Sequence, residues 1–327
     1  MRAVLCTTFG APGELVIGDI PAPVPAAGQV LIEVKAAGIN FPDSLFIAGK
    51  YQVKPPLPFV PGLELAGVVR AVGEGVAGFW PGQRVAAHPE SGGAFAEQAV
   101  VSAGRVFPIP DTLDFVTAAG FLITYGTSQH ALQDRGRLRP GETLLVLGAA
   151  GGIGLTAVEL GKAMGARVIA CASSAEKLAL CRDYGADETI DYSREDLRAR
   201  VKALTEGRGL DVVYDPVGGP YTEPMVRSLA RDGRYLVLGF AAGEIPKIPL
   251  NLVLLKTSAI VGAYWGPSID ADPEHNAANL AQLYAWHAQG RLRPHISETY
   301  PLEQAALAIE RVASRRTRGK VVLVVDA

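Results

Sequence analysis

The sequence predicts an α/β protein of two domains, an all-β barrel domain and a domain built on a doubly wound parallel sheet. The chain has 327 residues, which is enough for two hydrophobic cores. Residues 1 to about 115 are short apolar runs cut by Gly and Pro, a pattern typical of an all-β unit. From about residue 143 apolar runs alternate with stretches of helical periodicity, which predicts parallel strands joined by helical crossovers.

The barrel domain is expected over residues 1–120 and 265–327. The run from Leu63 to Val72 and the run from Trp80 to Val85 predict two strands joined by a glycine turn. Two helices are expected towards the end of the chain, at residues 276–290 and 302–312. The final run, residues 320–325, is too apolar to be left alone, so we expect it to return to this domain as a strand.

The parallel-sheet domain is expected over residues 121–264. A helical repeat over residues 114–132 precedes its first strand. The sequence predicts strands at residues 144–147, 168–171, 188–190, 212–214, 235–238 and 259–261. Helices are expected near residues 152–164, 175–184, 194–206 and 219–230. Six strands with intervening helices predict the strand order 3-2-1-4-5-6.

A glycine-rich turn between the first strand and its helix is the main functional signal. Its pattern Ala149-x-Gly151-x-x-Gly154 is the dinucleotide fingerprint with alanine at the first glycine. Glycine lets the backbone approach a pyrophosphate, and the helix N-terminus supplies free N–H groups and partial positive charge. The turn therefore predicts a Rossmann-type cofactor site at Ala149, Ala150, Gly151, Gly152, Ile153 and Gly154. The alternative is a glycine turn in a parallel sheet that binds nothing.

The end of the second strand favours NADPH over NADH. An NAD site usually places Asp or Glu about 20 residues after the glycines, where it binds the ribose diol. Here the chain continues as Ala172, Ser173 and Ser174, and the first acid, Glu176, stands beside Lys177. Small hydroxyls and an ammonium suit a 2′-phosphate. The alternative for Lys177 is a solvated side chain on a helix.

Composition excludes several classes of partner. The net charge of −2 provides no field for a polyanion, so neither nucleic acid nor an anionic membrane surface is expected. No run reaches the roughly 18 apolar residues of a membrane span, and no signal peptide is expected at the N-terminus. Three cysteines without CxxC spacing favour a reducing, cytoplasmic location.

A set of motifs in order along the chain resembles a known family. These are MRAVL, GINFPDSLFIAG, PFVPGLELAGVV, FLITYGT, AAGGIG, DVVYDPVGG and RGKVVLVV. Together they resemble the zinc-free quinone reductases, the zeta-crystallin-like group of the medium-chain dehydrogenase/reductase superfamily. The resemblance covers essentially the whole chain and implies a GroES-like β-barrel catalytic domain beside the Rossmann domain.

The resemblance also indicates that no metal is used. Zinc-dependent alcohol dehydrogenases of the superfamily have Cys at the position of Asn40 and His at the position of Leu63, and an amide and a leucine cannot hold zinc. Without a Lewis acid the substrate should accept hydride readily and delocalise its charge. Quinones and conjugated enones or enals do so, and the resemblance implies NADPH-dependent reduction of such a small molecule.

The family implies further site residues. Catalytic or pocket positions are expected at Asn40, Asp43, Tyr51 and Thr124. Beyond the glycine turn, cofactor positions are expected at Ser173, Ser174, Lys177, Tyr192, Gly239, Phe240, Tyr264, Trp265 and Arg315. Several have structural alternatives: Asp43 could cap a helix, Tyr51 could be an exposed loop residue, and Phe240 and Trp265 could be core residues. Arg316 and Arg318 compete with Arg315 for the 2′-phosphate, and no proton donor is identified.

Two other functions stay open from the sequence. The same scaffold supports an enoyl-thioester (2-enoyl-CoA) reductase, although no basic patch for an acyl carrier is visible. A cofactor-binding protein with a structural or regulatory role is the alternative from another class, because zinc-free relatives include lens crystallins. The family and the apolar segment 259–263 also lead us to expect a homodimer.

Overall fold

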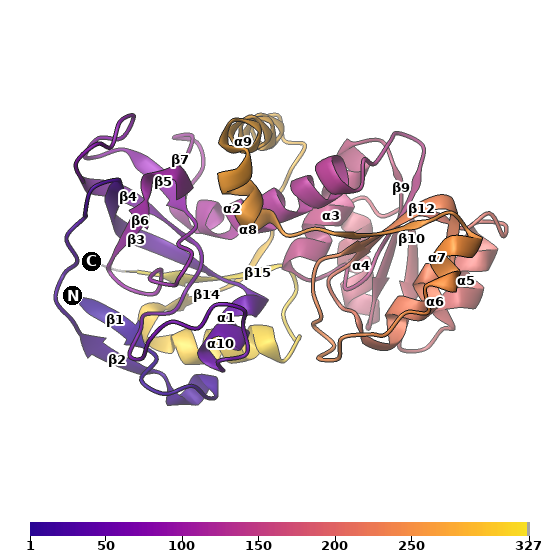
Figure 1. Cartoon of the computed structure of the whole chain (residues 1–327), viewed down its shortest axis with the longest axis horizontal. Helices are drawn as coiled ribbons and strands as arrows, with labels where there is room; N and C mark the ends of the chain where they lie inside the picture. The colour runs from indigo at the N-terminus through magenta and orange to yellow at the C-terminus, as the bar shows by residue number, and fades with distance from the viewer. Residues whose placement is uncertain (326–327) are drawn as a thin grey trace. The chain divides into compact units, whose positions relative to one another are not determined.

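The protein, described here by a computed structural model over residues 1–325, divides into two compact units (Figure 1). The first contains residues 1–123, residues 269–277 and the chain from Arg293 onwards. The second contains residues 124–268 and 278–292. The chain therefore crosses between the units several times, and each unit is described by itself below.

The first unit is built on β-strands. Seven of its strands form one sheet in the order β14-β15-β3-β4-β5-β7, with β6 paired to β3, and β1 and β2 form a separate antiparallel pair. The strands are β1 (Arg2–Leu5), β2 (Val16–Asp19), β3 (Gln29–Ile39), β4 (Leu65–Val72), β5 (Arg84–Ala87), β6 (Gln98–Ser102), β7 (Val106–Pro108), β14 (Ile296–Pro301) and β15 (Lys320–Val324). The helical segments are η1 (Pro12–Glu14), α1 (Phe41–Ile47), η2 (Ala103–Arg105), η5 (Leu302–Gln304) and α10 (Ala305–Ala313).

The C-terminal strand returns to the N-terminal unit, as the sequence predicts. β15 pairs antiparallel with β3, with Val321 opposite Ile39 and Leu323 opposite Ala37. These side chains are fully or almost fully buried in a core that also receives residues of α1 and α10. Strand β14 was not predicted, because its sequence, ISETYP, is mostly polar. It forms because it pairs in parallel with β15.

The second unit is a six-stranded sheet in the order β10-β9-β8-β11-β12-β13, with every pair parallel. This is the predicted order 3-2-1-4-5-6. The strands are β8 (Thr143–Val146), β9 (Arg167–Ala172), β10 (Glu188–Asp191), β11 (Leu210–Asp215), β12 (Leu229–Val237) and β13 (Ala259–Gly262). The helical segments wholly within this unit are η3 (His130–Arg135), α3 (Gly152–Ala163), α4 (Ala175–Asp183), α5 (Leu197–Leu204), η4 (Gly219–Tyr221), α6 (Thr222–Arg227) and α7 (Asn251–Leu255). Three helices have residues in both units: α2 (Phe115–Gln129), α8 (Trp265–Ala271) and α9 (Pro273–Ala288).

Several predicted boundaries differ from the structure, and two of these differences have a physical explanation. The helix predicted over 219–230 ends at Arg227, because β12 already begins at Leu229, where it pairs with Leu210. Residues 265–268 and 278–292, predicted in the barrel domain, belong to the second unit, and residues 121–123, predicted in the parallel-sheet domain, belong to the first. Amide side chains of α9 explain the second difference, since Gln129 Nε2 donates to Gln282 at 2.7 Å and Gln133 Nε2 donates to Asn279 at 3.1 Å.

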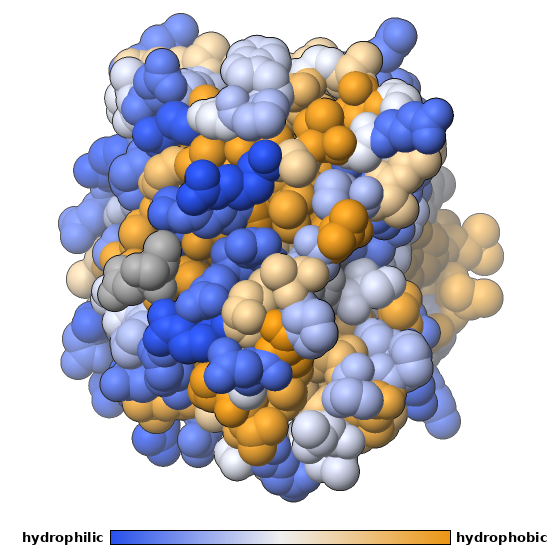
Figure 2. Space-filling model, turned by 90° about the vertical axis from the view of Figure 1, so that its left-hand side faces the viewer, coloured by the Kyte–Doolittle hydropathy of each residue, from blue (hydrophilic) through white to orange (hydrophobic). Residues whose placement is uncertain are grey.

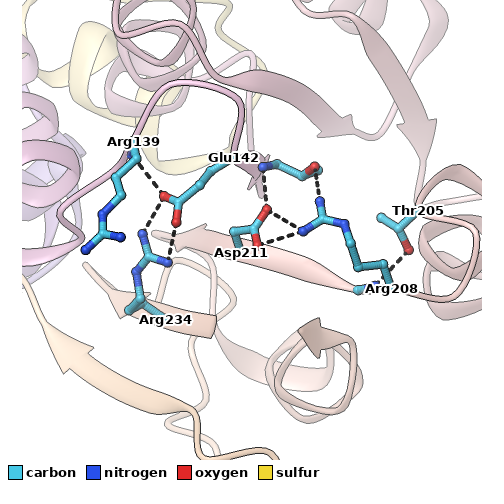
Figure 3. A network of polar contacts seen from close by, with 8 residues as sticks. Arg139, Glu142, Thr205, Arg208, Asp211 and Arg234 are labelled. Atoms are coloured by element: carbon cyan, nitrogen blue, oxygen red, sulfur yellow. Dashed lines mark hydrogen bonds and ion pairs between the residues drawn. The ribbon is translucent and has the colours of Figure 1, made fainter. Parts of the chain in front are cut away.

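Ion pairs tie together the amino ends of the central strands in the second unit (Figure 3). The Arg234 guanidinium donates two hydrogen bonds to the Glu142 carboxylate, at 2.6 and 2.9 Å. The Arg208 guanidinium likewise meets both oxygens of Asp211, and Asp211 accepts the backbone N–H of Thr143 at 2.7 Å. The glycine turn follows the opposite, carboxyl end of β8, so this network supports the sheet and does not contribute to a cofactor site.

The surface of the first unit seen in Figure 2 mixes hydrophobic and hydrophilic side chains. Exposed apolar residues of this unit include Val16, Ile17 and Val24. Isolated exposed apolar residues are normal for a folded domain and indicate no partner by themselves. Over residues 1–325 the structure has no helix whose length and hydrophobicity would let it cross a membrane.

Candidate functional site

The glycine turn lies at the carboxyl end of the central strand β8, where open parallel sheets bind ligands. Gly151 is the N-cap of α3 and donates its N–H to Gly148 O at 3.0 Å. A Cβ on Gly154 would lie 2.2 Å from Gly148 O and 2.9 Å from Ala149 Cα. The helix therefore approaches the strand as closely as the fingerprint requires, and the turn fits a dinucleotide pyrophosphate.

The structure explains why alanine, at Ala149, can stand where the dinucleotide fingerprint usually has its first glycine. Ala149 is fully buried, and its N–H donates to Cys171 O at 3.0 Å. The left-handed backbone conformation falls one residue earlier, at Gly148, where φ is 59°. Gly148 thus provides the backbone freedom that the motif usually assigns to its first glycine. Gly148 directly follows the predicted strand, and this position was the sequence signal for its role. The fingerprint match began at Ala149 and therefore did not include Gly148.

The residues predicted to meet a 2′-phosphate are partly brought together by β9 and β10. Asp191 pairs with Ala172, so Tyr192 and Ser173 leave the sheet side by side, and Tyr192 N donates to Ala172 O at 3.2 Å. Ser174 is the N-cap of α4, and its Oγ accepts the Lys177 N–H at 3.3 Å. Capping therefore explains Ser174 without a ligand.

The other predicted residues of the glycine turn differ in exposure. Gly152 and Ile153, in the first turn of α3, are half-buried, and Ala150 is buried.

Arg315 belongs to the first unit, whereas Lys177 and Tyr192 belong to the second. Arg315 is exposed and follows α10 in a left-handed conformation, with φ of 58°. Its N–H donates to Val312 O at 3.0 Å, which closes the end of that helix. A contact between Arg315 and a 2′-phosphate stays a prediction.

A buried carboxylate holds the loops after β11 and β12, a role that the sequence did not reveal. Asp215 Oδ1 accepts the N–H groups of Val217 and Gly218, at 2.7 and 2.8 Å. Its Oδ2 accepts the Tyr235 hydroxyl, and burial together with this carboxylate raises the pKa of Tyr235. The Asp215 network therefore sets the path of the glycine turn after β11.

The predicted positions Gly239 and Phe240 lie against that turn. A Cβ on Gly218 would come within 2.9 Å of Phe240 Cδ1, and Ala241 N donates to Pro216 O at 3.1 Å. Gly239 and Phe240 are both half-buried and follow β12, the neighbour of β11. They thus occupy the carboxyl edge of the sheet, on the other side of β8 from Ser173 and Tyr192.

Tyr264 and Trp265 follow β13 and have different environments. Tyr264 is 56% exposed, whereas Trp265 is 4% exposed. A Cβ on Gly126 would lie 2.6 Å from Trp265 Cζ2, so the indole packs directly on α2. The core interpretation therefore accounts for Trp265, and Tyr264 is the residue of this pair that a ligand can reach.

The predicted catalytic positions are divided between the units. Asn40, Asp43 and Tyr51 lie in the first unit, and Thr124 is the first residue of the second. Thr124 is buried, and its carbonyl accepts the Thr156 hydroxyl at 3.2 Å. The half-buried Tyr51 packs edge-on against Phe46, with ring centroids 5.8 Å apart.

Asn40 and Asp43 form the N-terminus of α1. Asn40 is the N-cap, and its backbone N–H donates to Asp43 Oδ2 at 2.6 Å. Asp43 therefore has the capping role that the sequence left open. It is fully buried, and burial raises the pKa of its carboxyl to about 7. Its other oxygen, Oδ1, has no hydrogen-bond partner within the described chain.

A buried ion pair beside Asn40 was not predicted. Lys320 Nζ donates to Glu64 Oε2 at 2.7 Å and to Asn40 Oδ1 at 2.6 Å. The Lys320 and Glu64 side chains are 5% and 0% exposed. These residues are 256 positions apart in the chain, and although each stands in a motif quoted for the family resemblance, no role was predicted for either.

The donor atoms near Asn40 do not suit a metal ion. The amide of Asn40 is bonded to an ammonium, and Leu63, the other position that corresponds to a zinc ligand, is a buried hydrocarbon. His88 is nearby, but one imidazole does not make a tetrahedral ligand set, and its Nδ1 is already 2.7 Å from Leu63 O. Over residues 1–325 no group of three or more His, Cys, Asp or Glu side chains is placed to hold a metal.

Comparisons with known proteins agree with both halves of the chain. Residues 26–111 match the family described as alcohol dehydrogenase GroES-like domain, and residues 152–283 match the family described as zinc-binding dehydrogenase. The chain is 39% identical over 325 residues to a quinone oxidoreductase-like protein 2 homolog of Nematostella vectensis, covering 98% of this chain and 88% of that protein. It is 36% identical over 322 residues to a quinone oxidoreductase of Pseudomonas aeruginosa, covering 98% and 99%.

A solved structure extends this likeness to three dimensions. The Escherichia coli quinone oxidoreductase complexed with NADPH superposes with a TM-score of 0.92 at 30% sequence identity. The match covers 99% of this chain and 100% of that chain.

Proposed function

We propose metal-independent hydride transfer from NADPH to quinones for this chain, because it belongs to the zinc-free quinone oxidoreductase-like group of the medium-chain dehydrogenase/reductase superfamily. It is an oxidoreductase, and its acceptor is a quinone or a similar conjugated enone or enal. The observation that carries the proposal is the close approach of α3 to the turn after β8, in a chain similar over its length to a quinone oxidoreductase complexed with NADPH.

The carboxyl edge of the sheet provides the cofactor-binding groups. Backbone N–H groups at the start of α3 would meet the pyrophosphate. Ser173, Lys177 and Tyr192 would surround the 2′-phosphate, and Arg315 is a further candidate for contact with it. Gly239, Phe240 and Tyr264 would adjoin the nicotinamide. When bound, NADPH supplies the hydride from C4 of its nicotinamide ring.

The acceptor must accept that hydride without a Lewis acid. The position of Asn40 offers an amide instead of a thiolate, and an amide can donate a hydrogen bond to the oxygen on which negative charge develops. A quinone or enone spreads this charge by conjugation, so modest hydrogen bonding is sufficient. Positioning of hydride donor and acceptor contributes further to the rate enhancement. Asn40 is therefore the first residue that we assign to the reaction.

A substrate panel tests the proposal. Steady-state oxidation of NADPH is measured with a naphthoquinone, a conjugated enone and crotonyl thioester under identical conditions. Turnover of the quinone or enone supports the proposal, and preference for the thioester supports an enoyl-thioester reductase. Tight NADPH binding without turnover of any acceptor would show that the chain is a cofactor-binding protein and would refute the proposed reaction.

The choice of cofactor makes a separate prediction. Replacing Lys177 with alanine is expected to raise the NADPH dissociation constant about 5- to 30-fold, the equivalent of roughly 1–2 kcal/mol for a charge-assisted contact. The NADH dissociation constant should stay unchanged, because NADH lacks the 2′-phosphate. Fluorescence titration with both nucleotides measures this, and Lys202→Ala on the exposed side of α5 serves as control. Equal affinity of the unmodified protein for NADH and NADPH would contradict our interpretation of Ser173 to Lys177.

A homodimer is part of the proposal. Strand β13 ends the sheet of the second unit, and its residue Ile260 is 39% exposed. In nearby α7, Leu254 and Leu255 are 75% and 76% exposed. An exposed apolar edge strand tends to pair with another chain. We therefore infer pairing of β13 with its copy in a second chain.

The homodimer is tested by mass. Ile260→Lys is expected to convert a dimer into a monomer at micromolar concentration, measured by light scattering, because lysine on an edge strand opposes pairing. Val24→Lys, at an 85% exposed position of the first unit, should leave the mass unchanged. A dimer that survives Ile260→Lys would place the interface elsewhere.

A location in the reducing cytoplasm is also proposed, and it is supported by three free cysteines, all buried.

A further inference from the structure

The aliphatic part of the Lys320 side chain packs closely against two glycines. A Cβ on Gly38 would lie 2.9 Å from Lys320 Cε and 2.6 Å from Glu64 Oε2. A Cβ on Gly120 would lie 3.0 Å from Lys320 Cγ. Any other residue at these positions would displace the lysine side chain or the backbone around it. The buried ammonium therefore has a built site and a defined position.

The Glu64 carboxylate has donors on both oxygens. Its Oε1 accepts the Ile123 N–H at 2.7 Å, and its Oε2 accepts Lys320 Nζ at 2.7 Å and Asn40 Nδ2 at 3.1 Å. An ion pair removed from water to this degree gains little net stability over apolar side chains of similar volume, because desolvation offsets the attraction. Stability alone therefore does not explain why these charges are buried beside Asn40.

The ion pair determines which way the Asn40 amide faces. Oδ1 accepts from Lys320, whereas Nδ2 donates to Glu64 and, at 3.3 Å, to Gly38 O. Rotating the amide by 180° would place its NH₂ against an ammonium and its oxygen against a carboxylate. Both contacts would become repulsive, so only one orientation is compatible with the charges.

We propose that Lys320 is a positioning residue for the reaction, which holds the Asn40 carboxamide with Oδ1 on the ammonium so that Nδ2, and not Oδ1, is the atom that can donate to an acceptor oxygen. This inference rests on the proposed function, in which Asn40 donates to the oxygen of the substrate. Both Nδ2 hydrogens have acceptors in the structure, so an acceptor oxygen would replace Gly38 O, whose bond of 3.3 Å is the longer and weaker of the two. The ammonium also polarises the amide through Oδ1, which strengthens Nδ2 as a donor.

The test removes both charges and retains the volume. Lys320→Met alone would leave Glu64 buried without a counter-ion and could prevent folding, so the principal variant is Lys320→Met/Glu64→Gln. Its kcat with naphthoquinone is expected to fall about tenfold, because a misplaced donor stabilises the transition state less. The KM for NADPH should change less than twofold. Arg234→Met/Glu142→Gln neutralises a pair at the amino edge of the other unit and is the matched control, with kcat unchanged.

A double-mutant cycle separates positioning from a general structural role. In an Asn40→Ala background, the Lys320→Met/Glu64→Gln change should alter kcat less than twofold, because its effect acts through Asn40. A full tenfold loss in that background, or an unchanged kcat in the folded double variant, would overturn the inference.

A second readout does not depend on turnover. The side-chain ¹H–¹⁵N signals of Asn40, assigned by their loss in Asn40→Ala, should shift in Lys320→Met/Glu64→Gln and stay in place in the Arg234/Glu142 control. Signals that do not shift would refute the role of Lys320. Absence of turnover in the unmodified protein with every acceptor would instead refute the proposed function, so the two failures are distinguishable.

Discussion

Replacing Gly154 with alanine is expected to destabilise the protein by about 3 kcal/mol or more and to abolish tight NADPH binding. The added Cβ would lie 2.2 Å from Gly148 O and 2.9 Å from both Gly148 C and Ala149 Cα. All three are backbone atoms of the turn, so no side-chain rotation can relieve the overlap. Helix α3 must move away from the strand, and the N–H groups that would meet the pyrophosphate move with it.

Gly151→Ala is the matched comparison, because it adds the same methyl group three residues earlier. There a Cβ has one close neighbour, Gly148 O at 3.3 Å, and the residue has φ of −80°, which alanine adopts readily. Its stability should stay within about 0.5 kcal/mol of the unmodified protein. NADPH affinity should still fall, since the methyl group restricts approach of the pyrophosphate to the backbone.

Urea unfolding and fluorescence titration with NADPH distinguish the two variants. Loss of stability with loss of binding is expected for Gly154→Ala, and loss of binding alone for Gly151→Ala. If Gly154→Ala retained the stability and the affinity of the unmodified protein, the close packing of α3 on β8 would not be what forms the site.

The parallel sheet could be predicted because its signals are local. Each strand is a short apolar run, and each crossover has helical periodicity. The glycine pattern after β8 lies between such a run and such a repeat, and it therefore indicates a strand, a turn and a helix in sequence. The right-handed crossover rule then limits the order of strands. The resemblance to the family supplied Tyr192, and the pairing of β9 with β10 places it beside Ser173. Residues that follow parallel strands meet at one edge wherever they stand in the chain.

The parts that could not be predicted depend on partners far away in the sequence. The polar segment that forms β14 has no strand pattern of its own and exists through pairing with β15. Lys320 looks like the first, exposed residue of a terminal strand, and Glu64 looks like a polar residue in a loop. Their pairing becomes visible only when β15 lies beside β3 and two glycines open the space between them.

A capping residue and a catalytic residue can have the same sequence signature, as Asp43 illustrates. Its position three residues after Asn40 suits both roles, and the structure shows the cap through the bond from Asn40 N to Asp43 Oδ2. The bond uses one oxygen and leaves Oδ1 buried without a partner in the described chain. A carboxyl in this environment is expected to keep its proton, which has a consequence for stability.

Asp43 is expected to make stability fall as the pH rises from about 4 to about 7. Burial, assisted by the Glu64 carboxylate, raises its pKa to about 7, although the backbone N–H groups of Asn40 and Leu63 and the Lys320 ammonium oppose the shift. In the unfolded chain an aspartate has a pKa near 3.9. Below pH 4 both states are protonated and the full stability is present. Between pH 4 and 7 the unfolded state ionises first, so stability is lost, by up to about 4 kcal/mol in total, and above pH 7 no further loss follows.

Asp43→Asn should remove this dependence, because an amide is neutral at every pH and still accepts the Asn40 N–H. The difference in free energy of unfolding, variant minus unmodified protein, is expected to rise by up to about 4 kcal/mol between pH 4 and 8. Urea unfolding at several pH values measures it, and groups common to both proteins cancel. Asp111→Asn, at a side chain that is 98% exposed, is the control and should give a flat difference. A flat difference for Asp43→Asn as well would show that Asp43 is ionised in the folded protein, stabilised by the Lys320 ammonium.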